Sequence, residues 1–333
     1  MMMLCRDMIA LGSSAGSVAA LRHLLAALPQ DLPATVLVAQ HQGQASELLS
    51  ALIDVSSLPI TYAEHGERLR SNHVYLAPAD HHLLVDDDQA AVSAGPRENR
   101  ARPAIDPLFR SAAAAGGSRL IAVQLTGALD DGVAGLDAVR RCGGLVVVQD
   151  PADAEFHAMP ENALNAGRAD HVVRLDEMAE LLTRLVGQAV EPFAAPQDIV
   201  LEARLSLPGP TRPAGVERVG AQVPLSCPDC GGPMWQSGEG DSATFRCHVG
   251  HALSTHVLLG AQSESIERSL WVAVRTLSEQ AATLHRLADS AHERSQPVES
   301  AYRARADEAL GHADQARSFL LSLRGSSASS TLD

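Results

Sequence analysis

Residues 8–40 read MIALGSSAGSVAALRHLLAALPQDLPATVLVAQ. Two apolar runs, Met8–Gly12 and Thr35–Gln40, flank a helical pattern over Val18–Leu28. The runs are apolar throughout rather than alternating, which is typical of strands that are buried on both faces of a parallel sheet. We therefore expect a strand–helix–strand unit whose two strands point the same way.

The same alternation of apolar runs and helical patterns continues to about residue 190. It predicts strands and helices in turn over Arg119–Thr126, Gly132–Arg141, Leu145–Gln149, Pro160–Ala166, His171–Arg174 and Glu177–Leu185. Residues 58–93 interrupt this pattern with short runs separated by turn-like residues, where we expect an antiparallel insertion or a sheet edge. The expected fold class is α/β, with a mainly parallel, doubly wound sheet.

The composition of the chain excludes several classes of protein. Its 333 residues include no Lys, and the balance of 26 basic against 40 acidic residues gives a net charge of −14. Such a charge argues against a general nucleic-acid binder. No apolar run reaches the roughly 18–20 residues that span a bilayer, and the first residues lack a cationic signal-peptide segment. We expect a cytoplasmic protein without membrane insertion.

A candidate nucleophile lies in the turn after the first predicted strand. Gly12–Gly16 has the form G-x-S-x-G between a strand and a helix, which places Ser14 at the carboxyl edge of the sheet. The N-terminus of the following helix could stabilise an oxyanion there. A Gly/Ser-rich turn can equally be a plain helix cap or a phosphate-binding loop, although a dinucleotide site would need G-x-G-x-x-G.

Two other strand ends carry the residue types that a serine nucleophile needs. His41 directly follows the second strand, and a base there lies within reach of Ser14 if the two strands are neighbours. The turn at residues 125–132 contains Asp130 and Asp131. Either acid could orient the imidazole, or simply cap the next helix. Ser, His and Asp at three strand ends indicate a single crevice.

These segments together resemble the methylesterase domain of CheB-type chemotaxis proteins, the protein-glutamate methylesterases. The resemblance covers about residues 7–187 and is carried by IALGSSAGS, VAQH, ENRARPAIDPLFRSAA, LTGALDDGVAG and QDPADAEFHAMPENA. It implies a catalytic triad of Ser14, His41 and Asp131, with Asp131 rather than Asp130 as the acid. The resemblance also implies an oxyanion and substrate loop formed by Ala15, Gly16, Ala128 and Leu129.

The resemblance further implies a function. Enzymes of this family remove methyl esters from glutamyl side chains on the cytoplasmic helices of chemoreceptors, and some also deamidate glutamine. A serine proton relay needs no metal or organic cofactor. Only about seven residues precede the first strand, where the chemotaxis enzymes carry a receiver domain, so we expect a stand-alone domain. Ala128-Leu129 replaces the family's common Met-Gly. Two alternatives stay open, a non-catalytic regulatory or scaffold protein and a hydrolase of another ester.

A second motif, between residues 223 and 256, contains metal-ligand residue types. Cys227 and Cys230 form a C-x2-C pair, and Cys247 and His251 follow as C-x3-H. Three Cys and one His suit a closed, tetrahedral structural Zn²⁺ site, and unrelated free thiols are the alternative.

Two histidines of this segment, His248 and His251, could supply the fourth metal ligand. His248 competes with His251, but its adjacency to Cys247 makes joint coordination awkward. The segment resembles a small zinc ribbon, with Trp235 and Phe245 as its minimal core, and a unit of this size would depend on metal for folding.

Heptad-like apolar stripes begin at Leu270 and at Tyr302, with Pro297 between them. They predict an antiparallel helical hairpin with an Ala-rich seam, either an ordinary packing unit or a contact surface for signalling proteins. The chain thus divides into a methylesterase-like domain, a Pro-rich linker, a zinc-ribbon-like segment, a hairpin and a disordered tail. The expected boundaries are 1–188, 189–222, 223–256, 257–324 and 325–333.

Overall fold

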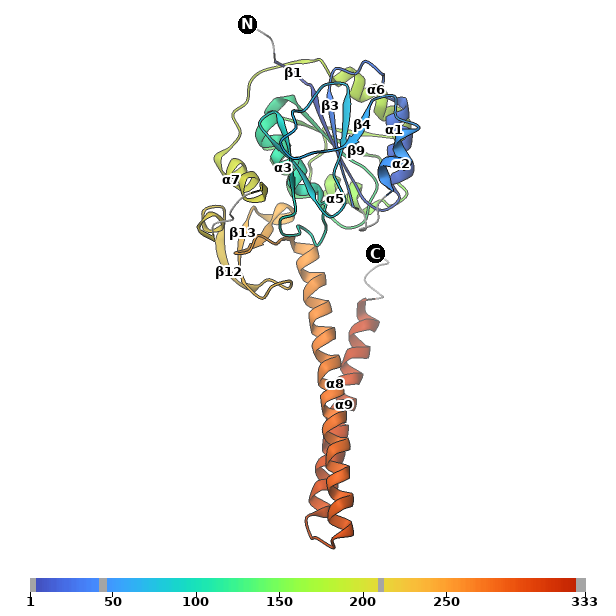
Figure 1. Cartoon of the computed structure of the whole chain (residues 1–333), viewed down its shortest axis with the longest axis vertical. Coiled ribbons are helices and arrows are strands. Elements are labelled where there is room, and N and C mark those ends of the chain that lie inside the picture. The colour runs from blue at the N-terminus through green and yellow to red at the C-terminus, as the bar shows by residue number, and fades with distance from the viewer. Residues whose placement is uncertain (1–3, 42–46, 209–212, 328–333) are drawn as a thin grey trace. The chain divides into compact units, whose positions relative to one another are not determined.

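The computed structural model describes residues 4–41, 47–208 and 213–327. The chain divides between Leu258 and Leu259 into two compact units. The strands at the centre of the first unit are β2 (Met8–Ser13), β3 (Thr35–Gln40), β4 (Ile60–Tyr62), β5 (His73–Leu76), β8 (Leu120–Gln124), β9 (Leu145–Gln149) and β10 (His171–Val173). They form one seven-stranded sheet in the order β10-β9-β8-β2-β3-β5-β4, and every neighbouring pair is parallel (Figure 1). The predicted α/β fold with a mainly parallel sheet is confirmed.

Helices cover both faces of this sheet. One face packs against α1 (Ser17–Ala27), α2 (Leu48–Ile53) and α6 (Leu175–Leu185), and the other against α3 (Ile105–Gly116), α4 (Val133–Arg141) and α5 (Ala158–Asn165). A short 3-10 turn, η1 (Gly117–Arg119), follows α3.

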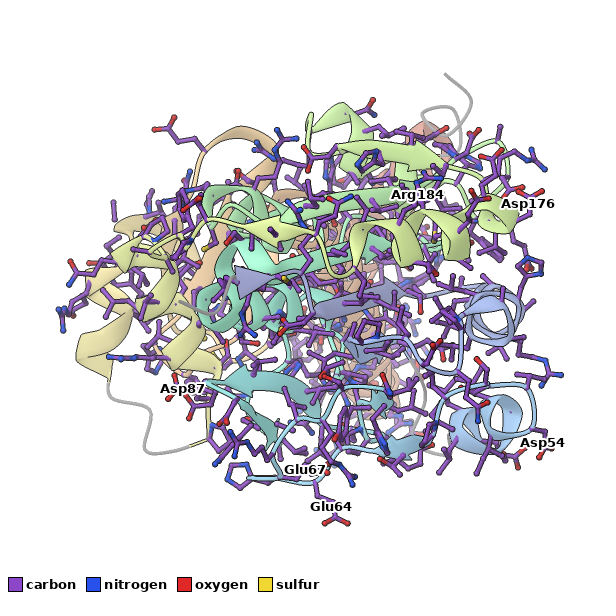
Figure 2. All side chains as sticks on the ribbon, turned by 90° about the horizontal axis from the view of Figure 1, so that it is seen from above. Asp54, Glu64, Glu67, Asp87, Asp176 and Arg184 are labelled. Carbon is purple, nitrogen blue, oxygen red and sulfur yellow. The ribbon has the colours of Figure 1, made fainter. Side chains whose placement is uncertain are left out.

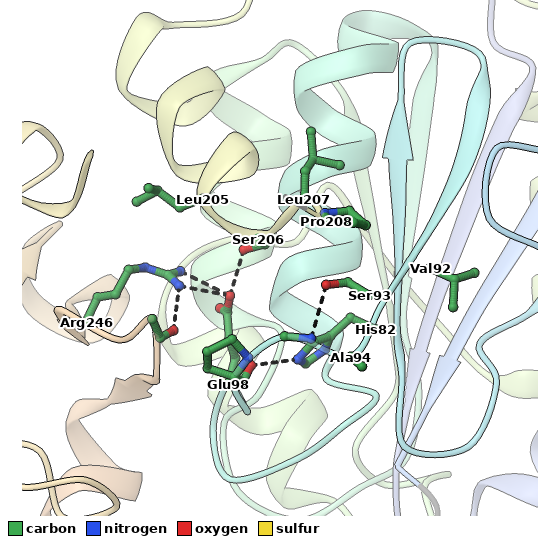
Figure 3. A pocket seen from close by; sticks show the side chains of 13 residues that line it. His82, Val92, Ser93, Ala94, Glu98, Leu205, Ser206, Leu207, Pro208 and Arg246 are labelled. Atoms are coloured by element: carbon green, nitrogen blue, oxygen red, sulfur yellow. Dashed lines mark hydrogen bonds and ion pairs between the residues drawn. The ribbon is translucent and has the colours of Figure 1, made fainter. Parts of the chain in front are cut away.

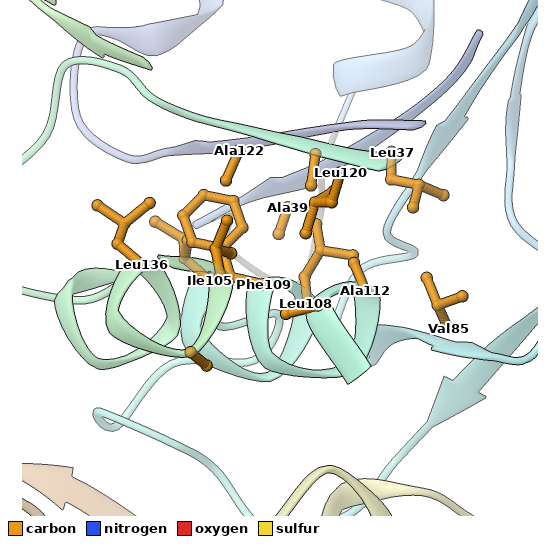
Figure 4. Packing of buried hydrophobic residues seen from close by; sticks show 14 of the residues in the cluster. Leu37, Ala39, Val85, Ile105, Leu108, Phe109, Ala112, Leu120, Ala122 and Leu136 are labelled. Atoms are coloured by element: carbon orange, nitrogen blue, oxygen red, sulfur yellow. The ribbon is translucent and has the colours of Figure 1, made fainter. Parts of the chain in front are cut away.

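The strands are apolar throughout because their side chains alternate between two cores. Along β2, Met8 and Ala10 join the core under α3, whereas Ile9 and Leu11 join the core under α1. Figure 4 shows Phe109 of α3 packed among side chains of the sheet. Burial on both faces is what a parallel sheet requires.

The segment expected to be antiparallel is so only in part. Strands β6 (His82–Asp86) and β7 (Gln89–Ser93) form a separate antiparallel hairpin. Strands β4 and β5 instead join the main sheet in parallel and form one of its edges, so this half matches the expected sheet edge and not the antiparallel insertion. Residues 63–72 carry the chain back to the same end of the sheet, which lets two short strands run in parallel.

Residues 189–222, expected to be a linker, contain regular structure. Strand β11 (Ala189–Val190) pairs antiparallel with β1 (Leu4–Cys5), and α7 (Gln197–Ser206) follows, then the 3-10 turn η2 (Pro213–Arg218). Ile199 and Ala203 of α7 are buried. The sequence did not indicate this helix, because its apolar residues include the consecutive Ile199, Val200 and Leu201 and form no clear helical stripe among so many prolines.

The Cys/His segment is a small antiparallel sheet. Its strands are β12 (Ala221–Ser226), β13 (Pro233–Ser237), β14 (Thr244–Cys247) and β15 (Ala252–Ser254), paired in that order, with the 3-10 turn η3 (Gly240–Ser242). Phe245 lies in its core as expected, but the neighbouring strand contributes Met234 rather than Trp235. Successive strand residues face opposite sides, so only one of these two can point inward.

The second unit is a hairpin of two long helices. They are α8, which begins in the first unit and spans Thr255–Glu293, and α9 (Glu299–Ser327). The predicted seam matches the structure, with Ala281, Leu284, Ala306 and Ala309 in one buried cluster. Helix α9 continues through residues 325–327, which we had expected in a disordered tail. The remaining tail residues, 328–333, lie outside the described part of the chain.

The surface of the first unit carries many charged side chains, including Asp54, Glu64, Asp87, Asp176 and Arg184, labelled in Figure 2. None of the helices in the described residues is long and apolar enough to cross a membrane.

Candidate active site

Ser14 lies in the turn between β2 and α1, at the carboxyl end of the sheet. Its backbone N–H donates to the carbonyl oxygen of Thr126, at 3.1 Å, which joins the turn to the loop after β8. The Ser17 hydroxyl donates to the Ser14 carbonyl oxygen at 2.5 Å. Gly16 adopts φ 70°, a left-handed conformation that suits glycine and lets α1 begin immediately afterwards. The turn therefore fixes the backbone on both sides of the Ser14 side chain.

His41 follows the neighbouring strand β3. Its backbone N–H donates to the carbonyl oxygen of Ser13 at 3.0 Å, so parallel pairing of β2 and β3 continues one residue beyond β3. The Nδ1 atom of His41 lies 3.0 Å from the hydroxyl oxygen of Ser14. Neighbouring parallel strands thus bring the two side chains into hydrogen-bond contact, as their positions in the sequence predict.

Asp131 lies in the loop between β8 and α4, on the other side of β2. Its Oδ2 is 2.5 Å from Nε2 of His41 and accepts the backbone N–H of Ile105 at 2.7 Å. Its Oδ1 accepts the backbone N–H of Asp106 at 3.2 Å and the side-chain amide of Asn99 at 2.8 Å. The carboxylate therefore sits at the N-terminus of α3, where backbone N–H groups and the helix dipole favour a negative charge.

The electrostatics keep one negative charge beside His41. Burial raises the pKa of Asp131, but the hydrogen bond and charge of His41 and the donors Ile105 and Asn99 outweigh it, so this pKa lies below its usual value. Burial and the nearby Asp131 carboxylate raise the pKa of Asp106 well above its usual value. The charge therefore resides on Asp131, which faces the imidazole.

The two neighbouring acids of this loop have different partners. Asp131 contacts His41, whereas Asp130 accepts hydrogen bonds from the Ser254 hydroxyl at 2.9 Å and from His256 Nδ1 at 3.0 Å. The residue types alone left open which of the two acids orients the imidazole. In the structure only Asp131 of these two contacts His41.

The four residues of the expected oxyanion and substrate loop lie in the two segments that meet at Ser14, its own turn and the loop after β8. Ala15 and Gly16 lie in its own turn, while Ala128 and Leu129 are exposed in the facing loop. Within the described residues, their backbone N–H groups have no hydrogen-bond acceptor. Free N–H groups beside a nucleophile are the donors that a developing oxyanion requires.

The facing loop approaches the nucleophile turn closely at Gly127. A Cβ atom at this position would lie 2.0 Å from the sulfur of Met159 and 2.8 Å from Cβ of Ser14. The Thr126 hydroxyl also donates to the carbonyl oxygen of Ala15 at 3.3 Å. Only glycine permits this approach.

The four residues expected to bind metal come together in the Cys/His segment. Their ligand atoms, from Cys227, Cys230, Cys247 and His251, all lie within 4.8 Å of one another. The Cys230 and Cys247 sulfurs are 3.7 Å apart, and Cys247 Sγ is 3.6 Å from His251 Nδ1. Tetrahedral bonds of about 2.3 Å separate two sulfurs by about 3.8 Å, so this ligand set fits Zn²⁺. The cluster contains His251 and not His248.

The sequence reasoning missed α3 and Asn99. Helix α3 supplies two of the donors to Asp131, and Asn99 supplies a third. A sequence signal for the helix existed, since Pro107 suits a first helical turn and Ala112–Ala115 favours helix. We find no signal for Asn99, because its role depends on contacts with residues far along the chain.

Comparison with known proteins gives consistent results. The family model described as CheB methylesterase matches residues 9–182. A relative from Leptospira interrogans is 40% identical over 182 residues, which cover 54% of this chain and 94% of that protein. Protein-glutamate methylesterase/protein-glutamine glutaminase 2 from Methanosarcina acetivorans is 34% identical over 192 residues, covering 55% of this chain and 54% of that protein.

A solved structure agrees with these matches. The crystal structure of the Thermotoga maritima CheB methylesterase catalytic domain is similar at a TM-score of 0.52 and 32% identity, and the match covers 55% of this chain and 100% of that one. The residues of the family match include Ser14, His41 and Asp131 and span over half of the sequence. The chain belongs to the CheB methylesterase family.

Proposed function

We propose that the chain hydrolyses methyl esters on glutamyl side chains of chemoreceptor cytoplasmic helices, with Ser14 as nucleophile, His41 as general base and acid, and Asp131 as the acid that orients His41. Such a substrate requires a cytoplasmic location. The observation that supports this proposal most is the continuous contact from Ser14 through His41 to the buried carboxylate of Asp131, over 3.0 and 2.5 Å. The names of the relatives supply the substrate class.

The geometry supports a two-step reaction. The Ser14 oxygen attacks the ester carbonyl carbon while His41 accepts the hydroxyl proton at Nδ1. The anionic Asp131 stabilises the resulting imidazolium, and N–H groups of Ala15 and Ala128 stabilise the oxyanion. His41 then returns the proton to the departing methoxide, which leaves as methanol.

Hydrolysis of the acyl-enzyme completes the cycle. A water molecule gives a proton to His41 and attacks the ester carbonyl, and the breakdown of the intermediate returns this proton to Ser14 and releases glutamate. The same steps applied to a glutamine side chain release ammonia in place of methanol, which would be the glutaminase reaction.

The test is the release of methanol from a methylated receptor fragment. We expect Ser14→Ala to lower the rate by at least about 10³-fold, as loss of the nucleophile does in serine hydrolases. Ser13→Ala is a matched control, because Ser13 is fully buried and its hydroxyl has no hydrogen-bond partner among the described residues. A Ser14→Ala rate within about threefold of the wild type would contradict a serine mechanism. Ammonia release from a fragment with glutamine at the same sites tests deamidation.

We also propose that Cys227, Cys230, Cys247 and His251 bind a structural Zn²⁺ in a zinc-ribbon-like segment. The proposal rests on the close approach of three thiol sulfurs and one imidazole nitrogen beneath a small sheet with a minimal core. Elemental analysis of the purified chain should give one zinc per chain, and Cys247→Ser should lower this content while Cys142→Ser, a buried cysteine outside the segment, should not.

The helical hairpin is a proposed contact surface for signalling proteins. Trp271 and Val272 of α8 are 43% and 49% exposed beside Arg268 and Arg275, and these residues line a shallow cavity. A Trp271→Ala/Val272→Ala variant should lose cross-links to chemotaxis signalling proteins while it keeps esterase activity. Unchanged cross-linking would contradict the role of this surface.

A further inference from the structure

The Cys/His segment adjoins the loop that leads into α3. The backbone N–H of Asn99 donates to the carbonyl oxygen of Ala252 at 2.8 Å, and the N–H of Ser254 donates to the side-chain oxygen of Asn99 at 2.8 Å. Glu98 also forms a parallel bridge with Ala252. Residues 97–99 therefore act as an additional edge partner of β15.

The side chain of Asn99 connects β15 to the carboxylate of Asp131. Its oxygen accepts from Ser254, and its nitrogen donates to Asp131 Oδ1 and to Asp106 Oδ2, both at 2.8 Å. The Asn99 amide is closer to Asp131 Oδ1 than the backbone N–H of Asp106, which lies 3.2 Å away. One amide group thus uses both of its ends to bridge the C-terminal segment and the triad.

Asp130 provides a second connection, one residue before Asp131. It is buried to 4% exposure and accepts from the Ser254 hydroxyl and from His256. The Ser254 hydroxyl also accepts the backbone N–H of Val257 at 3.2 Å, in the first turn of α8. Two successive acids of one loop therefore bind different partners. Asp131 contacts His41, and Asp130 contacts Ser254 and His256 of the C-terminal segment.

A buried ion cluster reinforces the same junction. Figure 3 shows Glu98 between Arg246 of β14 and Ser206 of α7, at the edge of a cavity of about 250 Å³. The two terminal guanidinium nitrogens of Arg246 both contact Glu98 at 3.1 Å, and Arg110 of α3 contacts it at 2.8 Å. Arg246 therefore joins the C-terminal segment to a Glu98–Arg110 ion pair of the domain, and removing the shared carboxylate would leave buried guanidinium groups unpaired.

We propose that Asn99 and Asp130 are positioning residues, through which the Cys/His segment fixes Asp131 against His41. This inference rests on the proposed serine mechanism. A carboxylate oriented by one hydrogen bond fewer can rotate about its χ angles, and misplacement of a catalytic group by about 1 Å can lower a rate by 10²-fold. The C-terminal segment would then be part of the working esterase rather than an appendage.

The test measures how fast and how completely a fluorophosphonate labels Ser14 in the full chain. In this reaction the Ser14 oxygen forms a bond to phosphorus while fluoride leaves and His41 takes the proton. We expect Asn99→Ala to lower the labelling rate by about tenfold or more, and Ser254→Ala/His256→Ala by about three- to tenfold, each with one adduct per chain at completion. Ser254→Thr, which keeps the hydroxyl, should react faster than the double variant.

The controls separate positioning from folding. Gln222→Ala, on the exposed side of β12 in the same segment, should react like the wild type. A positioning role lowers the rate and leaves the final extent unchanged, whereas partial unfolding lowers the extent. If Asn99→Ala fails to fold, the double variant decides.

Each other outcome counts against the inference. Wild-type rates in both variants, or a reduced extent at an unchanged rate, would overturn it and leave the serine mechanism standing. A wild-type chain that the probe does not label at Ser14 would overturn the proposed function and this inference with it.

Discussion

Ser13 and Ser14 are neighbours with opposite environments. Ser13 ends β2 and is fully buried, whereas Ser14 is half-buried and its hydroxyl contacts His41. The sequence predicts this difference, because side chains of a strand alternate and the G-x-S-x-G turn exposes its middle serine. The sequence does not predict the donors around Asp131, since Asn99, Ile105 and Asp106 reach it only through the folding of α3.

Replacing Asp131 by Asn tests whether its carboxylate orients His41, because the substitution changes a carboxylate into a neutral amide of the same shape. We expect Asp131→Asn to lower kcat for ester hydrolysis by about 10³–10⁴-fold, the loss that a wrong imidazole tautomer causes in Ser-His-Asp enzymes. Steady-state kinetics with a small ester measure this loss. Asp137→Asn in α4 is a control, since Asp137 pairs with Arg168 away from the triad. A loss below about tenfold would mean that Asp131 does not orient His41.

Glu98 should control part of the acid stability. Burial raises the pKa of Glu98, but Arg110 and Arg246 outweigh it and hold this pKa well below its usual value. Because the pKa is depressed on folding, its stabilisation is complete above the unfolded value of about 4.3 and declines as the pH falls further.

The corresponding variant is Glu98→Gln. We expect it to lower the free energy of unfolding at pH 7 by about 3 kcal/mol or more, because it leaves two buried guanidinium groups without a carboxylate. Its stability should also decline less than that of the wild type between about pH 5 and pH 3. Denaturant unfolding at several pH values measures both effects, and identical pH profiles would contradict this account.

At the scale of the elements, the sequence predicted the buried strands better than the helices. The strands β3 and β9 have the predicted bounds, because an apolar run between turn residues admits few other structures. All of the first nine residues of α3 are buried, including the charged Asp106 and Arg110, so this stretch has no solvent-exposed polar face of the kind that marks a surface helix. Helix α7 was not predicted because its apolar residues Ile199, Val200 and Leu201 are consecutive and form no clear helical stripe.

The packing of α3 on β2 requires glycine at position 12. A Cβ atom there would lie 2.3 Å from Ile105 and 2.7 Å from Phe109. We expect Gly12→Val to destabilise the sheet domain by about 1–3 kcal/mol through overpacking, and to lower esterase activity by displacing the start of α3 from Asp131. Gly311→Ala in α9 is the control, because among the described residues no atom outside its own stretch of helix backbone lies within 4 Å of the added methyl group. Thermal unfolding of both variants tests this, and an unaffected Gly12→Val would contradict it.

At the scale of the whole molecule, local patterns in the sequence indicate the Cys/His cluster and the helical hairpin, but not the structure between residues 189 and 222. The Cys/His cluster and the helical hairpin follow from ligand spacing and heptad stripes, which are local patterns. The contacts of Asn99 and Glu98 with β14 and β15 join residues about 150 positions apart, and no local pattern encodes such pairings. For the same reason, residues 189–222 were expected to be a linker, although they form β11 and α7 and pack on the domain.

Removing metal should unfold one part of the molecule selectively. With a strong chelator, we expect faster amide exchange over β12–β15 and little change in β2, β3 and β8, because the small segment has a minimal apolar core of its own. Hydrogen-exchange mass spectrometry resolves the two regions. Equal protection of β12–β15 with and without chelator would show that metal does not support this segment.

The most direct test of the serine mechanism is to identify the atom that a fluorophosphonate modifies. Peptide mapping of the treated chain should find a single adduct on Ser14, absent from Ser14→Ala and present in Ser13→Ala. An adduct on another residue, or none on the folded wild-type chain, would contradict the assignment of Ser14, His41 and Asp131 as the catalytic triad.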